Sequence, residues 1–307
     1  MKSRNLVIIL FLVIILFACS KGPSGSSSGG IDIKFTELPP SELYEGEQFS
    51  VTVLLSNSLS NDVHGLFCLR DTLTETYGGI PDRACVDVNL APASVDSKGK
   101  ISPYFHEMNF PRDSQIFPYQ RLDQIRYENI PIIGDFKYEV ETTAGAFACL
   151  KRPGSTAPYI SKECGTKQNL AVQQPNMPLK ISRLTSTPSR SGDSSIRLNL
   201  ELVLTKSKDG QLVGRGNVLQ SSQGSADISL QVLANQRDAQ CIGAPRGIVS
   251  FRPNENEKVI KCAVSIDLSN QEQVNVPVIV KIGYGFIQSV VGTDVDLIKS
   301  EEGVLVA

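Results

Sequence analysis

Apolar and polar residues alternate along most of the chain after residue 30. A period of two places one set of side chains on a buried face and the other on a solvated face, which is typical of a half-buried β-strand. Convincing amphipathic helices of ten or more residues are absent from the pattern. We therefore predict an all-β protein, with strands in the segments 31–35, 49–55, 86–90, 136–141, 196–202, 228–232, 274–276 and 295–297.

Turn-forming residues separate these segments, and one polar stretch with two prolines, 173–178, divides them into two groups. A chain of 307 residues is long enough for about two domains of 100 to 150 residues, each with its own core. We therefore expect two tandem β-sandwich domains, residues 31–177 and 178–307.

The N-terminal segment has the features of a signal peptide. Lys2 and Arg4 precede an unbroken apolar run that ends at Ala18, which is shorter than the roughly 20 residues of a transmembrane helix. The following sequence LFAC, ending at Cys19, resembles the lipobox of envelope lipoproteins. The resemblance implies that residues 1–18 are removed and that Cys19 is lipidated, which would anchor the protein to the membrane on its extracytoplasmic side. An uncleaved N-terminal anchor and an ordinary cleaved signal are the alternatives.

Composition supports a tethered domain. Residues 19–30 consist of the candidate lipidated cysteine and a Gly- and Ser-rich linker that cannot form a core. The charges of the 30 basic and 32 acidic residues nearly cancel, so the chain has no net positive charge that would attract nucleic acid. Removal of residues 1–18 would change the formal net charge from −2 to −4. Electrostatic attraction of the whole chain to anionic lipid headgroups therefore adds little to the lipid anchor.

Six further cysteines fall into three couples that are close in sequence. Each couple brackets a turn-rich segment between two predicted strands, which favours pairing within the couple, although six cysteines allow fifteen connectivities. No C-x-x-C is present and the two histidines are isolated, so a zinc site is the weaker interpretation. The couples are Cys68 with Cys85, Cys149 with Cys164, and Cys241 with Cys262.

Several stretches resemble a known class of module. Residues 39–62, PPSELYEGEQFSVTVLLSNSLSND, are similar to the opening of immunoglobulin-like and CARDB-like modules, and the cysteine-containing stretches that follow are similar to modules of envelope lipoproteins, particularly archaeal ones. Residues 276–299 fit the closing strands of a second such module. The resemblance implies scaffolding or recognition rather than chemistry. Unlike immunoglobulin domains proper, the chain has closely spaced cysteines and no tryptophan.

Catalytic motifs are missing from the sequence. Neither G-x-S-x-G nor H-E-x-x-H occurs, so a hydrolase would depend on His64 or His106. The carboxylate pairs at 139 and 141 and at 294 and 296 have the spacing of solvated strand faces. We expect a non-enzymatic protein without a cofactor or a metal.

The most unusual stretch is 104–127, where aromatic residues alternate with arginines and two prolines prevent a long helix. Aromatic residues and arginine are enriched at binding hot spots, so this stretch is the candidate surface for an envelope or surface protein, or for a glycan. A cap over the core is the alternative. The candidate residues are Tyr104, Phe105, Phe117, Tyr119, Arg121 and Arg126.

Overall fold

The computed structural model describes residues 25–27, 30–73, 75–81, 84–112, 116–156, 164–216 and 225–300. It confirms the all-β prediction: the described residues form strands and two short 3-10 turns, η1 (Glu75–Tyr77) and η2 (Pro245–Gly247). The signal-like segment and Cys19 lie outside the described residues, so the predictions about them stay predictions.

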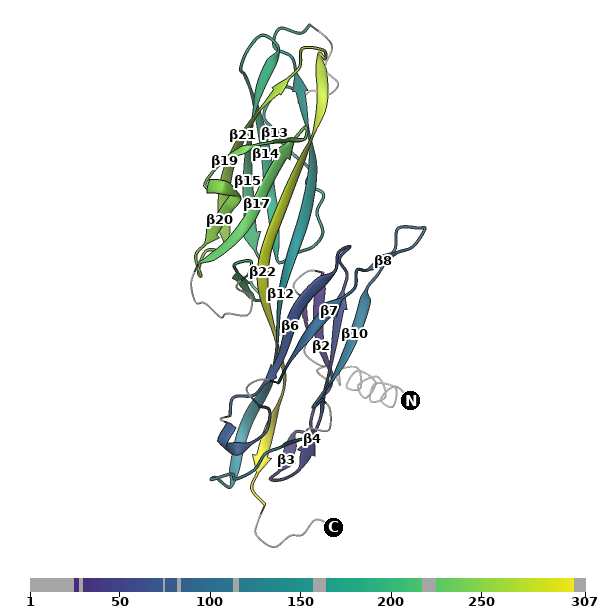
Figure 1. Cartoon of the computed structure of the whole chain (residues 1–307), viewed down its shortest axis with the longest axis vertical. Helices are drawn as coiled ribbons and strands as arrows, with labels where there is room; N and C mark the ends of the chain where they lie inside the picture. The colour runs from purple at the N-terminus through teal and green to yellow at the C-terminus, as the bar shows by residue number, and fades with distance from the viewer. Residues whose placement is uncertain are drawn as a thin grey trace, which may run out of the picture.

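A nine-stranded sheet, called here the shared sheet, runs through the whole molecule (Figure 1). Its main path is β18-β17-β22-β12-β6-β7, with β16 and β3 also paired to β22 and β20 paired to β17. The bounds are β3 (Glu42–Tyr44), β6 (Val63–Arg70), β7 (Ala84–Leu90), β12 (Arg126–Lys151), β16 (Gln211–Val213), β17 (Ala226–Ala234), β18 (Arg237–Asp238), β20 (Ile248–Phe251) and β22 (Gln273–Ile298).

Two further sheets pack against the shared sheet and make an elongated molecule with two lobes (Figure 1). The lower sheet is β1 (Gly25–Ser27), β2 (Ile31–Glu37), β5 (Val51–Asn57) and β10 (Tyr104–Phe110). The upper sheet is β13 (Gln168–Asn169), β14 (Leu179–Arg190), β15 (Ser195–Lys206), β21 (Glu257–Asp267) and β19 (Gln240–Ile242). Two small pairs complete the fold: β4 (Gln48–Phe49) with β11 (Phe117–Pro118), and β8 (Ser94–Val95) with β9 (Ile101–Ser102).

Strands β12 and β22 are each 26 residues long and pair antiparallel from one end of the molecule to the other. Their register begins at Arg126 with Ile298 and ends at Lys151 with Gln273. The sequence pattern predicts separate strands at 274–276 and 295–297, and both are parts of β22. Four of the polar side chains between them lie on exposed positions of the strand, whereas Gln288 is buried; the exposed ones are Lys281, Ser289, Thr293 and Asp294.

The shared sheet crosses the expected boundary between residues 177 and 178. Strand β22 follows that boundary in sequence. It nevertheless pairs with β12 and with β3, and both of these strands precede the boundary. Met177 itself is buried, and the carbonyl of Pro178 accepts a hydrogen bond from Ser207. The division into two domains therefore stays a prediction about folding, while the two lobes have one sheet in common.

Aromatic side chains fill the waist between the lobes. Tyr138 on β12 is fully buried, with its ring 5.0 Å from that of Phe136 and 5.9 Å from that of Phe286 on β22. Tyr284, also fully buried, accepts a hydrogen bond from the Leu179 amide at the start of β14. In the lower lobe, Phe67 and Phe110 join the shared sheet to the lower sheet at 5.8 Å. One apolar core thus continues through both lobes.

The three disulfides are the neighbouring couples expected from the sequence. The bonds Cys68–Cys85 and Cys241–Cys262 each join residues that lie directly opposite on adjacent antiparallel strands. Cys149–Cys164 holds the segment after β12 against the upper part of that strand. There the buried side chain of Gln168 imitates a strand partner, since it accepts from the Cys149 amide at 3.1 Å and donates to the Cys149 carbonyl at 2.8 Å.

Replacing Phe67 by alanine should lower the free energy of unfolding by about 3 to 5 kcal/mol, because it leaves a cavity between two sheets. The matched control is Phe147→Ala, since Phe147 lies on the same long sheet but is 65% exposed. That control should change the free energy by about 0.5 kcal/mol or less. Urea denaturation of the oxidised protein, followed by circular dichroism, measures both, and equal effects would contradict the buried position of Phe67.

Candidate functional site

The six candidate residues of the stretch 104–127 do not form one surface. Tyr104 and Phe105 begin β10 and are exposed. Phe117 and Tyr119 are buried near the opposite end of the lower lobe, where β11 pairs with β4. Arg121 is exposed and adopts a left-handed backbone conformation, with a φ of 57°. The stretch therefore divides into a part that caps the core and a part that faces solvent.

Phe117 and Tyr119 cannot contact a partner, and the expectation that they belong to a binding surface is wrong for these two residues. Their rings lie 5.7 and 5.4 Å from the ring of Phe49. The Tyr119 hydroxyl donates to the Asp71 carboxylate at 2.7 Å. Burial, and then the neighbouring Asp71 charge, raise the pKa of Tyr119 well above its usual value. The ring is held in the core because its one polar atom has a partner there.

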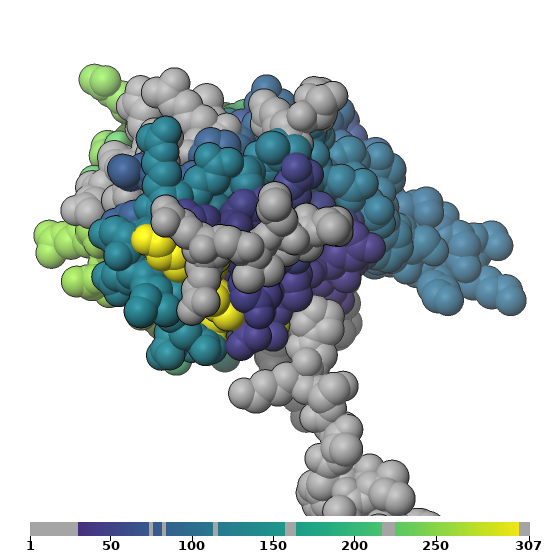
Figure 2. Space-filling model, turned by 90° about the horizontal axis from the view of Figure 1, so that it is seen from below, coloured from purple at the N-terminus to yellow at the C-terminus, as the bar shows by residue number. Residues whose placement is uncertain are grey.

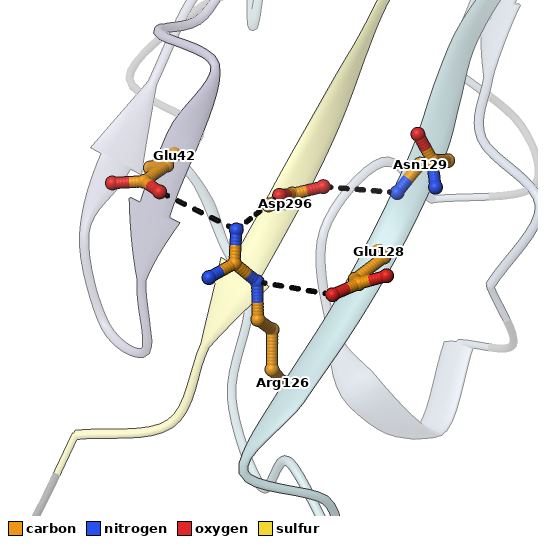
Figure 3. A network of polar contacts seen from close by, with 5 residues as sticks. All are labelled: Glu42, Arg126, Glu128, Asn129 and Asp296. Atoms are coloured by element: carbon orange, nitrogen blue, oxygen red, sulfur yellow. Dashed lines mark hydrogen bonds and ion pairs between the residues drawn. The ribbon is translucent and has the colours of Figure 1, made fainter.

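Arg126 forms a network of ion pairs that joins three strands at the lower end (Figure 3). Its guanidinium lies 2.5 Å from Asp296 on β22, 3.4 Å from Glu42 on β3 and 3.7 Å from Glu128 on its own strand. The Asn129 amide also donates to Asp296 at 3.0 Å. Arg126 thus connects a residue near the start of the folded region with one near its end.

The network sets the charge state of Asp296. The hydrogen bond from Arg126, followed by that from the Asn129 amide, lowers the pKa of the Asp296 carboxyl below its usual 3.8. A folded pKa below the unfolded value means that this contribution to stability is present above the unfolded pKa. It is lost as the pH falls through the folded pKa. The geometry thus assigns Arg126 to a structural contact, although part of its side chain remains exposed.

The two histidines lie apart from each other. His64, on β6, lines a shallow hollow of about 390 Å³ on the outer face of the shared sheet, together with Asp87, Lys137 and Glu139. His106 is on β10 of the lower sheet. Within the described ranges, neither imidazole has a hydrogen-bond partner that would make it part of a catalytic pair.

A larger hollow of about 670 Å³ lies in the upper lobe, beside β17 and β22. Polar and charged side chains from five strands and η2 line it, among them Glu141, Gln231, Asp238, Arg246 and Lys281. Sequence reasoning did not find it, because residues up to 142 positions apart, Glu141 and Gly283, contribute to it and no motif connects them. Its lining contains no aromatic residue.

Arg215 crosses the outer face of the shared sheet beside this hollow and pairs with Glu141 at 3.4 Å. The next residue, Gly216, donates its amide to Glu139 at 2.6 Å. Gly283 makes the crossing possible, since a Cβ there would come within 2.5 Å of the Ser229 hydroxyl and 3.3 Å of the Arg215 guanidinium. The paired carboxylates at 139 and 141 therefore bind a neighbouring segment of the chain.

Comparisons with family models, with curated proteins and with solved structures found no match to this chain. Among the described residues, no group of three or more histidine, cysteine or acidic side chains is arranged to hold a metal ion. The part of the chain that the structure describes also contains no helix long and apolar enough to cross a membrane.

Arg126→Ala should raise the pKa of Asp296 toward 3.8, with the remaining depression due to the Asn129 amide. The stability lost on substitution should be largest near neutral pH and should shrink as the pH falls below the unfolded pKa. NMR titration of the Asp296 carboxyl measures the first effect, and denaturation at several pH values measures the second. Arg190→Ala, which removes an exposed pair with Asp193, is the control and should leave Asp296 unchanged.

Proposed function

We propose that this chain is a lipid-anchored, extracytoplasmic protein of immunoglobulin-like, CARDB-like β-sandwich structure that acts as a non-enzymatic structural or interaction module at the cell envelope. One observation carries the proposal: three disulfides hold an elongated all-β body whose sequence begins with a signal-like segment and Cys19. Its partner is an envelope or surface protein, and nucleic acid is not a partner.

The disulfides support a location outside the reducing cytosol. Structural disulfides persist mainly in oxidising compartments, where no thiol pool reduces them. Cys68, Cys85 and Cys241 retain partial exposure to solvent, so a cytosolic reductant would reach at least two of the three bonds. A compartment that preserves all three bonds is also the compartment to which a signal peptide leads.

The shape supports interaction rather than chemistry. Strands β12 and β22 stay paired from one end of the molecule to the other, and this continuous backbone pairing sets its length (Figure 1). Rigid β scaffolds of this kind present loops and hairpins at fixed distances, which suits recognition of another surface. Among the described residues, neither histidine has a partner that would make it part of a catalytic pair, and Glu139 and Glu141 bind the segment at Arg215 and Gly216.

The alternative, a carbohydrate- or small-ligand-binding accessory protein, has less support. An aromatic platform for a glycan would have to emerge from residues 104–127, and the rings of Phe110, Phe117 and Tyr119 are buried. The polar hollow beside β17 offers hydrogen-bonding groups but no ring on which a sugar could stack. Protein interaction therefore remains the leading proposal.

Cys19→Ser should release the protein from membranes of the producing cells into the soluble fraction after washing with high salt. The hydroxyl cannot form the thioether, so the acyl chains that hold the protein are lost. Ser20→Ala is the adjacent control and should stay membrane-bound. Intact mass of both variants reports whether residues 1–18 have been removed and whether acyl chains are present. If Cys19→Ser stays in the membrane fraction, and if the masses of both variants still include residues 1–18, the protein is held by an uncleaved N-terminal anchor instead.

A further inference from the structure

Four exposed apolar side chains are concentrated in one short segment of the lower lobe. Val95, Ile101 and Phe105 are 62, 55 and 59% exposed, and Tyr104 is 37% exposed. The other exposed large apolar side chains of the described residues are spread over both lobes, as is normal for a protein surface. These four residues are called the hairpin surface below.

Two residues of the hairpin surface, Val95 and Ile101, lie on a β-hairpin that projects from the body of the protein (Figures 1 and 2). Tyr104 and Phe105 begin the next strand, β10, and point to opposite faces of it. Val95 and Ile101 are directly opposite each other on β8 and β9. The turn between them is ordered by Asp96, whose carboxylate accepts from the amides of Lys98 and Lys100, each at 2.8 Å. The hairpin thus combines an exposed apolar pair with two lysines at its tip.

Strand β2 begins beside the base of this hairpin. The Gly30 carbonyl accepts from the Ser58 amide at 2.7 Å, and the next residue, Leu59, accepts from the Ala93 amide at 2.7 Å. Residues 30 and 93 are therefore held by consecutive residues of one turn. The start of β2 and the strand that leads into the hairpin therefore lie at the same end of the lower sheet, while β1, antiparallel to β2, carries the chain back from that end to the level of Lys34.

The length of the tether limits how far the lower sheet can lie from the bilayer. Strand β1 returns along β2 and places Gly25 opposite Lys34. Six residues then connect Gly25 to Cys19, and at about 3.3 to 3.6 Å per residue they span about 20 Å at most. Strand β10 lies three strand spacings from β1, about 14 Å, and the strand register puts Phe105 level with Ser27, about 7 Å along β1 from Gly25. Phe105 is therefore about 16 Å from Gly25. A bilayer held by this tether is within reach of Phe105.

We propose that the hairpin surface is a second membrane contact, in which Val95, Ile101, Tyr104 and Phe105 enter the headgroup region of the bilayer. The proposal rests on the lipidation of Cys19 proposed above. Exposed apolar and aromatic side chains next to lysines are the combination found at membrane interfaces. The lysines supply local attraction to anionic lipid that the net charge of the whole chain does not. With this contact, the lower lobe lies against the membrane instead of rotating freely on its tether.

The absence of tryptophan from the sequence makes a direct test possible. Phe105→Trp places a single tryptophan on the hairpin surface. Phe147→Trp places one on β12 in the upper lobe, at a site that is 65% exposed, and is the matched control. Both full-length variants are purified from the membrane fraction and reconstituted into vesicles of phosphatidylcholine and phosphatidylglycerol whose acyl chains are brominated. Bromine quenches tryptophan fluorescence only at short range.

The expected result is that the tryptophan at 105 is quenched severalfold more than the one at 147 and that its emission shifts to the blue. Adding Val95→Ser and Ile101→Ser to the Phe105→Trp variant should remove most of the difference, because the apolar pair no longer enters the bilayer. Equal, weak quenching at both sites in acylated protein would overturn the membrane contact and would leave the anchor intact. Intact mass without acyl chains would instead overturn the proposed anchor, so the two failures are distinguishable.

Discussion

The pairing of β12 with β22 is the constraint on which the rest of the structure depends. Every other strand of the shared sheet attaches directly or indirectly to this pair. About 120 residues of chain separate the end of β12 from the start of β22, so the pairing closes a long loop and its entropic cost must be offset by what packs on it. The waist aromatics and the two outer sheets supply that packing.

Covalent and non-covalent contacts have different ranges in this fold. Each disulfide joins residues 15 to 21 positions apart and therefore stabilises a local unit. The contacts between distant parts are non-covalent: the long backbone ladder, the Tyr284 hydroxyl at the waist, and the Arg126 network at the lower end. The disulfides thus hold parts of each lobe, and the shared sheet holds the lobes to one another.

The aromatic stretch 104–127 illustrates how one composition has two roles. Its first residues lie on an edge strand of the lower sheet and remain exposed beside the hairpin. Its middle residues pack under β4 because Asp71 accepts the one hydrogen bond that Tyr119 needs. Arg126, at its end, is used to join strands. Residue types indicated that the stretch is important, but they could not indicate which face each residue occupies.

The sequence by itself determined the class of fold and the places of several strands, and it favoured the three disulfides that the structure contains. These follow from interactions between near neighbours: the period of two along a strand, turn residues, and cysteines that bracket short segments. Only the tertiary structure decided that β12 and β22 run unbroken through both lobes, that Phe117 and Tyr119 are buried, and that Gly283 lets Arg215 reach Glu141. The reason is physical: these features depend on contacts between residues far apart in sequence, and alternation is the same whether a strand ends at a lobe or continues into the next.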